Sequence, residues 1–294
     1  MNGPRPEPGL VIVDKSGGMT SHDVVAQVRR LAGTRKVGHA GTLDPMATGV
    51  LVVGIERATR LLGHLMITEK AYDATVRLGE STTTDDAEGE PLATASTGHL
   101  TEEAIGAAFA GQVGDIEQVP TAVSAIKVDG KRAYALARAG EQVELKARPV
   151  TVHELTVHEI RRSGDATDVD ISVRCSSGTY VRAIARDVGA ELAVGGHLTA
   201  LRRTAVGPYG LDVAHTLDEL GEEFAVLPIA DAARAAFPAY DLDERQASDV
   251  RVGRRLALGL DALTAVFAPD GAFLALYEPT ADAAVARPVA VFTG

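Results

Sequence analysis

A glycine-rich loop at positions 38–49, with the sequence GHAGTLDPMATG, most constrains what this chain can fold into. It carries one ionisable carboxylate, Asp44, and the apolar run VLVV follows it at 50–53. Glycine lets the backbone come close to a partner and adopt positive φ, and an Asp-Pro step favours a turn. The pattern predicts a single carboxylate on a tight loop beside a buried strand. Such a carboxylate suits a nucleophile or a general base, and an Asx turn that only caps its own backbone is the alternative.

The composition is that of a soluble globular protein. Its 294 residues, 46% hydrophobic and 23% charged, suffice for one large domain and a small one. No apolar run approaches the roughly 20 residues that a membrane helix needs, and the first residues lack the pattern of a signal peptide. We therefore expect a cytoplasmic protein. The single cysteine, Cys175, excludes an internal disulfide and predicts a buried structural thiol rather than a metal ligand or nucleophile.

The net charge of −11 argues against a nucleic-acid partner unless basic side chains gather on one face. Three basic clusters flank the candidate site motifs, while the acidic excess lies elsewhere, at 85–90 and 218–223. We predict that the clusters form a phosphate-binding surface, with solvated helix faces as the alternative. The clusters are Arg29, Arg30, Arg35 and Lys36; Lys127, Lys131, Arg132 and Arg138; and Arg202 with Arg203.

The spacing of apolar residues predicts helices and strands that follow one another irregularly. Helices are expected at 21–32, 101–109, 133–139 and 180–192, the first with Ser21 as N-cap and Gly33 after its last turn. Strands are expected at 10–13, 50–54, 71–78, 123–128, 150–160 and 169–175, with a hairpin turn at Asp129 and Gly130. Because no regular βαβ period appears, the pattern predicts an α+β fold with a mixed, largely antiparallel sheet and flanking helices.

A composition change near 236–238 predicts a domain boundary. Residues 1–236 would form the large domain and residues 237–294 a second, smaller one. In the second part short apolar runs alternate with turns, as at 256–258, 266–267 and 273–277, which indicates a small β domain.

Several further motifs occur in the same order as in the TruB family of pseudouridine synthases, which the chain resembles over about residues 9–215. The Asp44 loop is similar to the catalytic loop of that family. One departure is visible, because Ser16 stands where the family usually has proline, which loosens a turn without touching the chemistry. The other motifs are VDKSGGMTS at 13–21, KAY at 70–72, LG at 78–79, TDDAEG at 84–89, SAIK at 124–127, ARPV at 147–150, CSSGTYVR at 175–182 and LRR at 201–203.

The resemblance implies a bacterial, stand-alone pseudouridine synthase that isomerises the uridine at position 55, in the T-loop of tRNA. The base must be flipped out of the folded RNA, at a cost of a few kcal/mol that stacking on an aromatic ring partly offsets. It also implies that the reaction needs no cofactor, no metal and no obligatory protein partner. The small C-terminal domain is similar to the PUA module, although its few lysines leave a purely stabilising role as an alternative.

The resemblance assigns three catalytic residues. Asp44 would attack either C1′ of the ribose or C6 of the base. Tyr72 would stack on the target base and later take the proton from C5, with a plain sheet aromatic as the alternative. Arg182 would pair with Asp44 through its guanidinium fork and keep the carboxylate ionised, which a lysine would not reproduce.

A second group is expected to contact the RNA. His39 would contact the flipped-out nucleotide, Tyr180 would pack beneath the base, and Leu201 would form an apolar wall of the uracil pocket. Lys15 is grouped with them, although bracing of the site loop is the more natural role for it. The residues expected to contact phosphates are Lys127, Lys131 and Arg132, which would make binding sensitive to salt.

Three other functions fit parts of the pattern. Relatives of the TruB family act inside guide-RNA particles, but the chain shows no long basic tail. An RNA-binding folding aid would not need the three catalytic residues. A carboxylate-dependent hydrolase would need a second catalytic carboxylate or a metal cluster. Asp85 and Asp86 are candidates for it, but the composition of their segment predicts a solvated turn.

Overall fold

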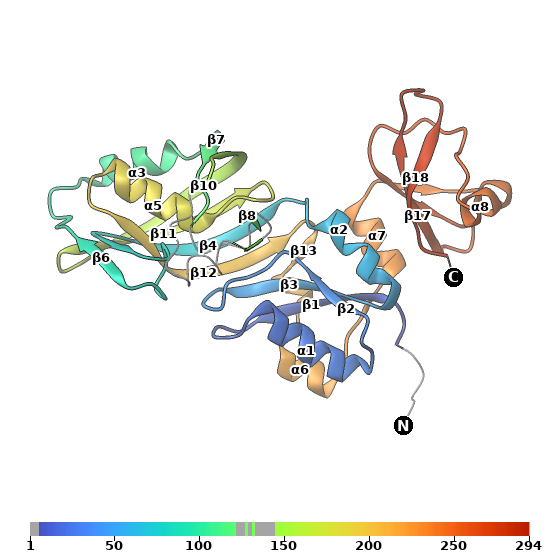
Figure 1. The fold of residues 1–294 in the computed structure, drawn as a ribbon, viewed down its shortest axis with the longest axis horizontal. Coiled ribbons are helices and arrows are strands. Elements are labelled where there is room, and N and C mark those ends of the chain that lie inside the picture. The colour runs from blue at the N-terminus through green and yellow to red at the C-terminus, as the bar shows by residue number, and fades with distance from the viewer. Residues whose placement is uncertain (1–5, 122–126, 129–130, 133–144, 294) are drawn as a thin grey trace.

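The computed structural model describes residues 6–121, 127–128, 131–132 and 145–293. Within them one large mixed sheet of ten strands runs through the molecule, in the order β14-β1-β3-β12-β4-β11-β10-β7, with β2 added to β3 and β13 to β12 (Figure 1). The strands are β1 Gly9–Lys15, β2 Val37–Ala40, β3 Thr48–Ile55, β4 Lys70–Leu78, β7 Gly114–Gln118, β10 Arg148–Ser163, β11 Ala166–Cys175, β12 Gly196–Val206, β13 Tyr209–Gly210 and β14 Leu227–Pro228.

All neighbouring strands of this sheet pair antiparallel except β3 and β12. The parallel contact sets Thr48 opposite Arg202 and Gly49 opposite Arg203. It brings the start of β3, and with it the loop that carries Asp44, against the middle of β12. The prediction of an α+β fold with a largely antiparallel sheet is confirmed.

Helices α1, α3, α5 and α6 cover one face of the large sheet, and α2 and α7 pack on the other face against β1 and β3. The main hydrophobic core joins the inward side chains of the strands to the apolar faces of α1, α3, α5 and α6, such as Val28, Phe109 and Ile184. Each apolar face follows the 3.6-residue period, and threonine caps begin α1, α3 and α6. The helices are α1 Ser21–Ala32, α2 Leu62–Leu65, α3 Glu102–Ala110, α5 Val181–Glu191, α6 Leu217–Glu222, α7 Ile229–Ala236 and α8 Glu244–Arg251, with 3₁₀ turns at Glu56–Arg60 and Leu211–Val213.

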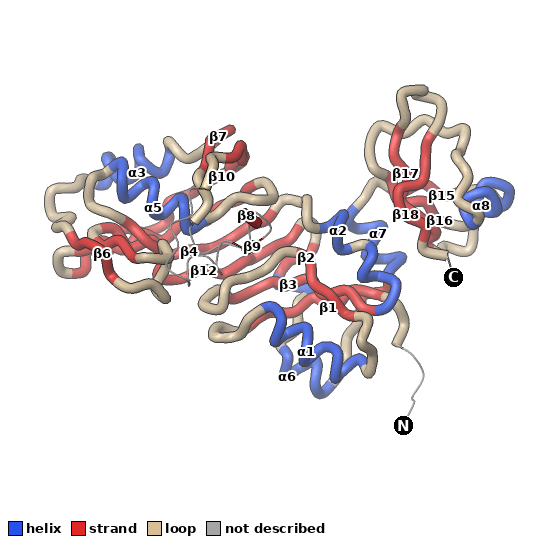
Figure 2. Tube along the Cα trace, in the orientation of Figure 1, coloured by secondary structure: helices blue, strands red, loops and turns tan. Residues whose placement is uncertain are grey.

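A smaller four-stranded sheet follows α7 and lies at one end of the molecule (Figure 2). Its strands are β15 Ala239–Asp241, β16 Thr264–Phe267, β17 Phe273–Pro279 and β18 Ala286–Val291. Phe267, Phe273 and Phe292 pack into a core that also holds Leu61 from the start of α2 and Ala233 of α7. This small sheet therefore shares buried surface with the large one. None of the helices in the described residues is long and apolar enough to span a membrane.

Two short hairpins complete the described elements. β5 Glu80–Thr82 pairs with β6 Pro91–Thr94, and β8 Lys127–Val128 pairs with β9 Lys131–Arg132. The expected strand residues 123–126, the turn at Asp129 and Gly130, and the helix at 133–139 lie outside the described residues.

Most predicted elements are present, with differences at their ends. The N-cap of α1 is Thr20, whose side chain accepts from the Asp23 amide, so the prediction of Ser21 is wrong by one residue. Ser21 is buried, and its hydroxyl bonds to the backbone of Leu43 instead. Strand β12 and helices α6, α7 and α8 were not predicted from the sequence. β12 contains the adjacent cations Arg202 and Arg203, which hide its alternation, and the three helices have only six to eight residues each.

Candidate active site

The loop that carries Asp44 joins β2 to β3 and is fixed by two buried side chains. The Ser21 hydroxyl accepts from the Leu43 amide at 2.9 Å and donates to the Leu43 carbonyl at 3.1 Å. The Lys15 ammonium, fully buried, donates to the carbonyls of Ser16, Met19 and Pro45 at 2.8–3.2 Å. Burial lowers the pKa of Lys15, with Asp44 opposing the shift. Lys15 therefore braces the loop, and it has no exposed surface to offer to RNA.

Gly49 ends the loop where β3 meets β12. Its φ is +97°, and a Cβ atom there would lie 2.2 Å from the Arg203 carbonyl oxygen. Both the left-handed backbone and the close approach of β12 exclude a larger residue. The glycine thus permits the parallel contact that sets the position of the loop.

The Asp44 carboxylate faces the guanidinium of Arg182, from the first turn of α5. Arg182 Nη2 lies 3.1 Å from Asp44 Oδ2, and Arg182 Nη1 lies 3.2 Å from Asp86 Oδ2. Nη1 also donates to the Thr84 carbonyl at 2.9 Å. One buried cation therefore spans two carboxylates. Burial raises the pKa of Asp44 and Asp86 adds to this, while Arg182 opposes it.

Asp86 is a site residue that the sequence did not predict. The expected solvated turn at 85–86 is wrong, because the Asp86 residue is only 2% exposed. Its Oδ1 accepts from the Thr84 hydroxyl and from the Glu88 amide, which fixes the carboxylate toward Arg182. The signal available in the sequence is the TDDAEG motif itself, which carries no indication of burial.

A pocket of about 320 Å³ opens in front of Asp44, at the low end of the roughly 300–1,000 Å³ typical of ligand pockets. The Asp44 loop and the 177–182 segment line it, together with Tyr72 of β4 and Leu201 of β12. Tyr72 stands opposite Arg203 in the strand register. Burial raises the pKa of Tyr72, and a hydrogen bond with Arg203 counteracts that shift. The structure thus brings the three predicted catalytic residues, Leu201 and Tyr180 to one pocket.

Tyr180 is held through its backbone. Its amide donates to Gln118 Oε1 at 2.7 Å and its carbonyl accepts from Gln118 Nε2 at 3.1 Å. Gln118, buried at the end of β7, therefore fixes the entry to α5 and with it the position of Arg182. It is a second residue that the sequence did not single out.

His39 lies on β2, outside the residues that line this pocket. Its ring meets that of His22 edge-on, with centroids 5.6 Å apart. Burial lowers the pKa of His39, and its Nδ1 atom is buried without a partner among the described residues. The ring is therefore held neutral beside the Asp44 loop.

The structure tests the predicted basic clusters only in part. Arg29, Arg30, Arg35 and Lys36 are exposed on α1 and the turn after it. Lys127, Lys131 and Arg132 lie on the β8–β9 hairpin, and Arg138 lies outside the described residues. The prediction that Arg202 and Arg203 form part of a phosphate-binding surface is wrong. Arg203 is 1% exposed, and Arg202 forms a two-pronged pair with Asp14, at 2.6 and 3.1 Å.

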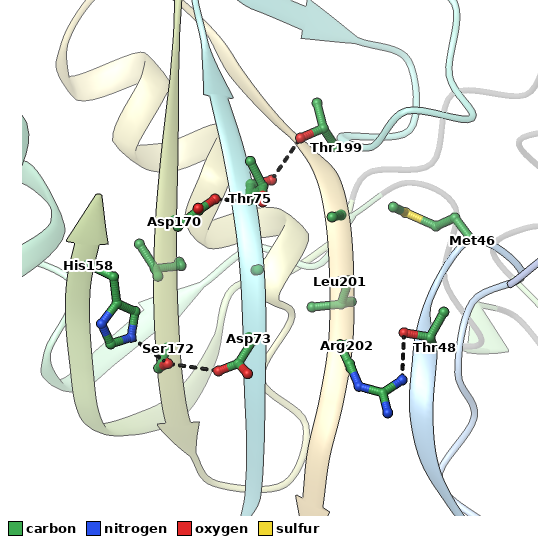
Figure 3. Close-up of a pocket in the computed structure, with 13 residues that line it drawn as sticks. Met46, Thr48, Asp73, Thr75, His158, Asp170, Ser172, Thr199, Leu201 and Arg202 are labelled. Carbon is green, nitrogen blue, oxygen red and sulfur yellow. Dashed lines mark hydrogen bonds between the residues drawn. The ribbon is translucent and has the colours of Figure 1, made fainter. Parts of the chain in front are cut away.

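A wider groove of about 610 Å³ lies on the opposite face of β4, β10 and β11 (Figure 3). His158 Nε2 lies 2.7 Å from the Ser172 hydroxyl, which donates to Asp73 Oδ1 at 2.7 Å. Because the serine and not the histidine contacts the carboxylate, this chain of groups lacks the order of a nucleophilic triad. The groove is therefore not a hydrolase site of that kind.

Comparisons with known proteins identify the family. The model described as TruB family pseudouridylate synthase (N terminal domain) matches residues 29–181, more than half of the chain. The chain belongs to the TruB family of pseudouridylate synthases. Two further models match, tRNA pseudouridylate synthase B C-terminal domain at 182–233 and tRNA Pseudouridine synthase II, C terminal, at 237–293.

Relatives in the TruB family match over nearly their full length. The chain is 59% identical to tRNA pseudouridine synthase B of Arthrobacter sp. (strain FB24), over 97% of this chain and 96% of the relative. It is 60% identical to the protein of that name from Thermobifida fusca (strain YX), over 97% and 99%. Among solved structures, an H/ACA RNP bound to a substrate RNA containing 2′-deoxyuridine matches with a TM-score of 0.74 at 24% identity, over 100% of this chain and 92% of that one. At that identity the likeness concerns the fold alone.

Proposed function

We propose that the protein isomerises the uridine at position 55, in the T-loop of tRNA, to pseudouridine, with Asp44 as the nucleophile. One observation carries this proposal: the Asp44 carboxylate faces Arg182 in a pocket that Tyr72 also lines. The TruB family membership and the relatives named tRNA pseudouridine synthase B support the choice of reaction and substrate.

The geometry supports an order of steps. The target base leaves the RNA stack and enters the pocket, where Leu201 and the ring of Tyr72 offer apolar faces for stacking. Asp44 then attacks C1′ or C6, the N1–C1′ bond breaks, the base rotates, C5 joins C1′, and the bond to Asp44 breaks, which restores the carboxylate. Tyr72 takes the proton from C5 as its own phenolic proton passes to solvent, and N1 gains a proton from solvent. Arg182 keeps Asp44 ionised against the effect of burial, which otherwise favours the neutral acid.

The RNA outside the pocket would meet residues at its edge. We assign His39 to the displaced nucleotide, Tyr180 to the underside of the base, and Lys127, Lys131 and Arg132 on the β8–β9 hairpin to phosphates. Lys15 acts indirectly, by bracing the Asp44 loop through Pro45. We also propose that residues 237–294 form a small PUA-like domain that stays attached to the catalytic domain at 1–236 through the shared core.

The chain would act alone on tRNA, without a guide RNA. The experiment incubates the purified protein with an unmodified tRNA transcript and maps pseudouridine by carbodiimide labelling and primer extension. The expected result is one modified site, at position 55, and none in a transcript with cytidine there. Modification that appears only after a guide RNA is added, or at other uridines alone, would contradict the proposal.

A further inference from the structure

Two buried cations, Lys70 and Arg203, lie beside Tyr72 in the wall of the active-site pocket. Lys70 begins β4 and is 8% exposed, and Arg203 of β12 is 1% exposed; both line the pocket. A Cβ atom built on Gly41 would lie 3.5 Å from Lys70 Cε and 3.6 Å from Arg203 Nη1. The two side chains therefore reach the same point beside the catalytic loop.

Only neutral groups of the described residues hold these two cations. The Lys70 ammonium donates to the carbonyls of Met66 and Thr68 at 3.0 and 2.9 Å. The Arg203 guanidinium donates to the carbonyls of Val50, Gly41 and Thr42 at 2.7–3.4 Å. Neither forms an ion pair with a described carboxylate, whereas Arg182 of the same pocket faces two. A buried charge without a counter-ion is costly, so a wall of this kind is suited to a ligand that becomes negative.

The ionisable groups around Lys70 come from three strands and from the rest of the pocket lining. Arg203 lies on β12, Cys175 faces Lys70 from β11, and Tyr72 follows on β4; Asp44 and Arg182 line the same pocket. Burial and Arg203 lower the pKa of Lys70 to about 8, while Cys175 raises it. The ammonium is therefore charged at neutral pH and loses its proton only slightly above it.

The reaction creates a negative charge inside this pocket. When the N1–C1′ bond breaks, its electron pair leaves with the base, so the detached uracil carries a charge shared among N1, O2 and O4. The charge disappears when C5 bonds to C1′, the proton leaves C5 and N1 gains one. If Asp44 attacks C6 instead, the charge of the carboxylate passes into the ring as an enolate on O4, so the ring becomes negative on that route too. Preorganised donors aimed at developing charge are commonly the largest source of rate enhancement.

We propose that Lys70 donates an N–H to the detached uracil ring and, together with Arg203, stabilises its negative charge. The proposal rests on the proposed function. A phosphate of the RNA backbone is the other anion available. The burial of both cations, 8% and 1% exposed, and the position of Arg203 opposite Tyr72 in the strand register favour the base, which would stack on Tyr72.

The test compares Lys70→Met with Lys70→Arg in single-turnover tritium release and in RNA binding. Loss of the charge should slow the reaction about 10²–10³-fold, as for removal of one oxyanion-stabilising donor. Binding should weaken less than about threefold, because the interaction exists only while the base is detached. Lys70→Arg should recover most of the rate. Arg77→Met removes a cation from the opposite face of the same strand and should leave the rate unchanged.

Three outcomes would overturn the proposal. The first is a Lys70→Met rate equal to that of the wild type. The second is an unchanged rate with weakened RNA binding, where the slope of the logarithm of the binding constant against the logarithm of the salt concentration falls in magnitude by about one. That result would identify a phosphate contact. The third is no tritium release from the wild type, which would remove the proposed function as well.

The pH profile gives a readout that a structural role would not change. The wild-type rate, measured with enzyme concentrations too low to saturate the RNA, should fall above pH 8 as the Lys70 ammonium deprotonates. The fall should be about tenfold per pH unit. In Lys70→Arg this decline should move to higher pH, because a guanidinium stays charged there. A decline at the same pH in both proteins would belong to another group and would contradict the proposal.

Discussion

Arg182 Nη2 lies 3.1 Å from Asp44 Oδ2, and this contact joins the first turn of α5 to the loop between β2 and β3. The same guanidinium contacts Asp86 and the Thr84 carbonyl. The two terminal nitrogens of the guanidinium therefore contact different partners. These contacts hold Arg182 in place, favour the ionised form of Asp44 and orient its carboxylate. The chemistry of this site depends on a cation that is itself held in place.

Arg182→Lys should reduce the single-turnover rate by about 10²-fold or more, because a single nitrogen cannot take the places of Nη1 and Nη2, which face different carboxylates. Binding of tRNA and the far-ultraviolet circular dichroism spectrum should change little. Retention of the wild-type rate would show that the fork geometry is unnecessary.

Asp44→Asn should be at least as stable as the wild type at pH 7. The pKa of Asp44 is raised in the folded protein, so its ionisation weakens folding above the folded-state pKa. That penalty disappears as the pH falls below the unfolded-state value, and the two proteins should converge there. Urea unfolding at several pH values measures the difference. A variant less stable than the wild type at pH 7, with a gap that widens toward acid, would contradict the assigned direction.

Gly49→Ala should destabilise the protein by more than about 3 kcal/mol, through left-handed strain and collision with the Arg203 carbonyl. Gly271→Ala is the matched control, since Gly271 has φ +84° but open space around it, and strain alone costs about 1–2 kcal/mol. Denaturant midpoints compare the two. Equal losses would mean that β12 does not need the close approach at Gly49.

The catalytic loop, β4 and α5 could be predicted because their signals are local. Glycines and an Asp-Pro step mark the loop, alternation marks β4, and helical spacing marks α5. The burial of Asp86 could not be predicted from such local signals. Asp86 meets Arg182 and Leu198, both far away in the sequence, whereas its own acidic segment has the composition of a solvated turn.

The two arginines of β12 illustrate the same limit. Arg202 and Arg203 are adjacent in the sequence, but alternation along the strand sends them to opposite faces. Arg202 reaches Asp14 at the surface, and Arg203 is buried against the catalytic loop. The pairing of β12 with β3 and β4 determines which of the two faces the pocket. The pairing of strands far apart in the sequence therefore decided what a local charge pattern could not.

The central claim is that Asp44 performs the chemistry. Tritium release from T-arm stem-loop RNA labelled with [5-³H]uridine tests it most directly, with no cofactor or guide added. The variants are Asp44→Asn and, as a matched control, Asp73→Asn on the opposite face of β4. The account predicts release by the wild type and Asp73→Asn, and none by Asp44→Asn with RNA binding intact. Release by Asp44→Asn at near the wild-type rate would contradict it.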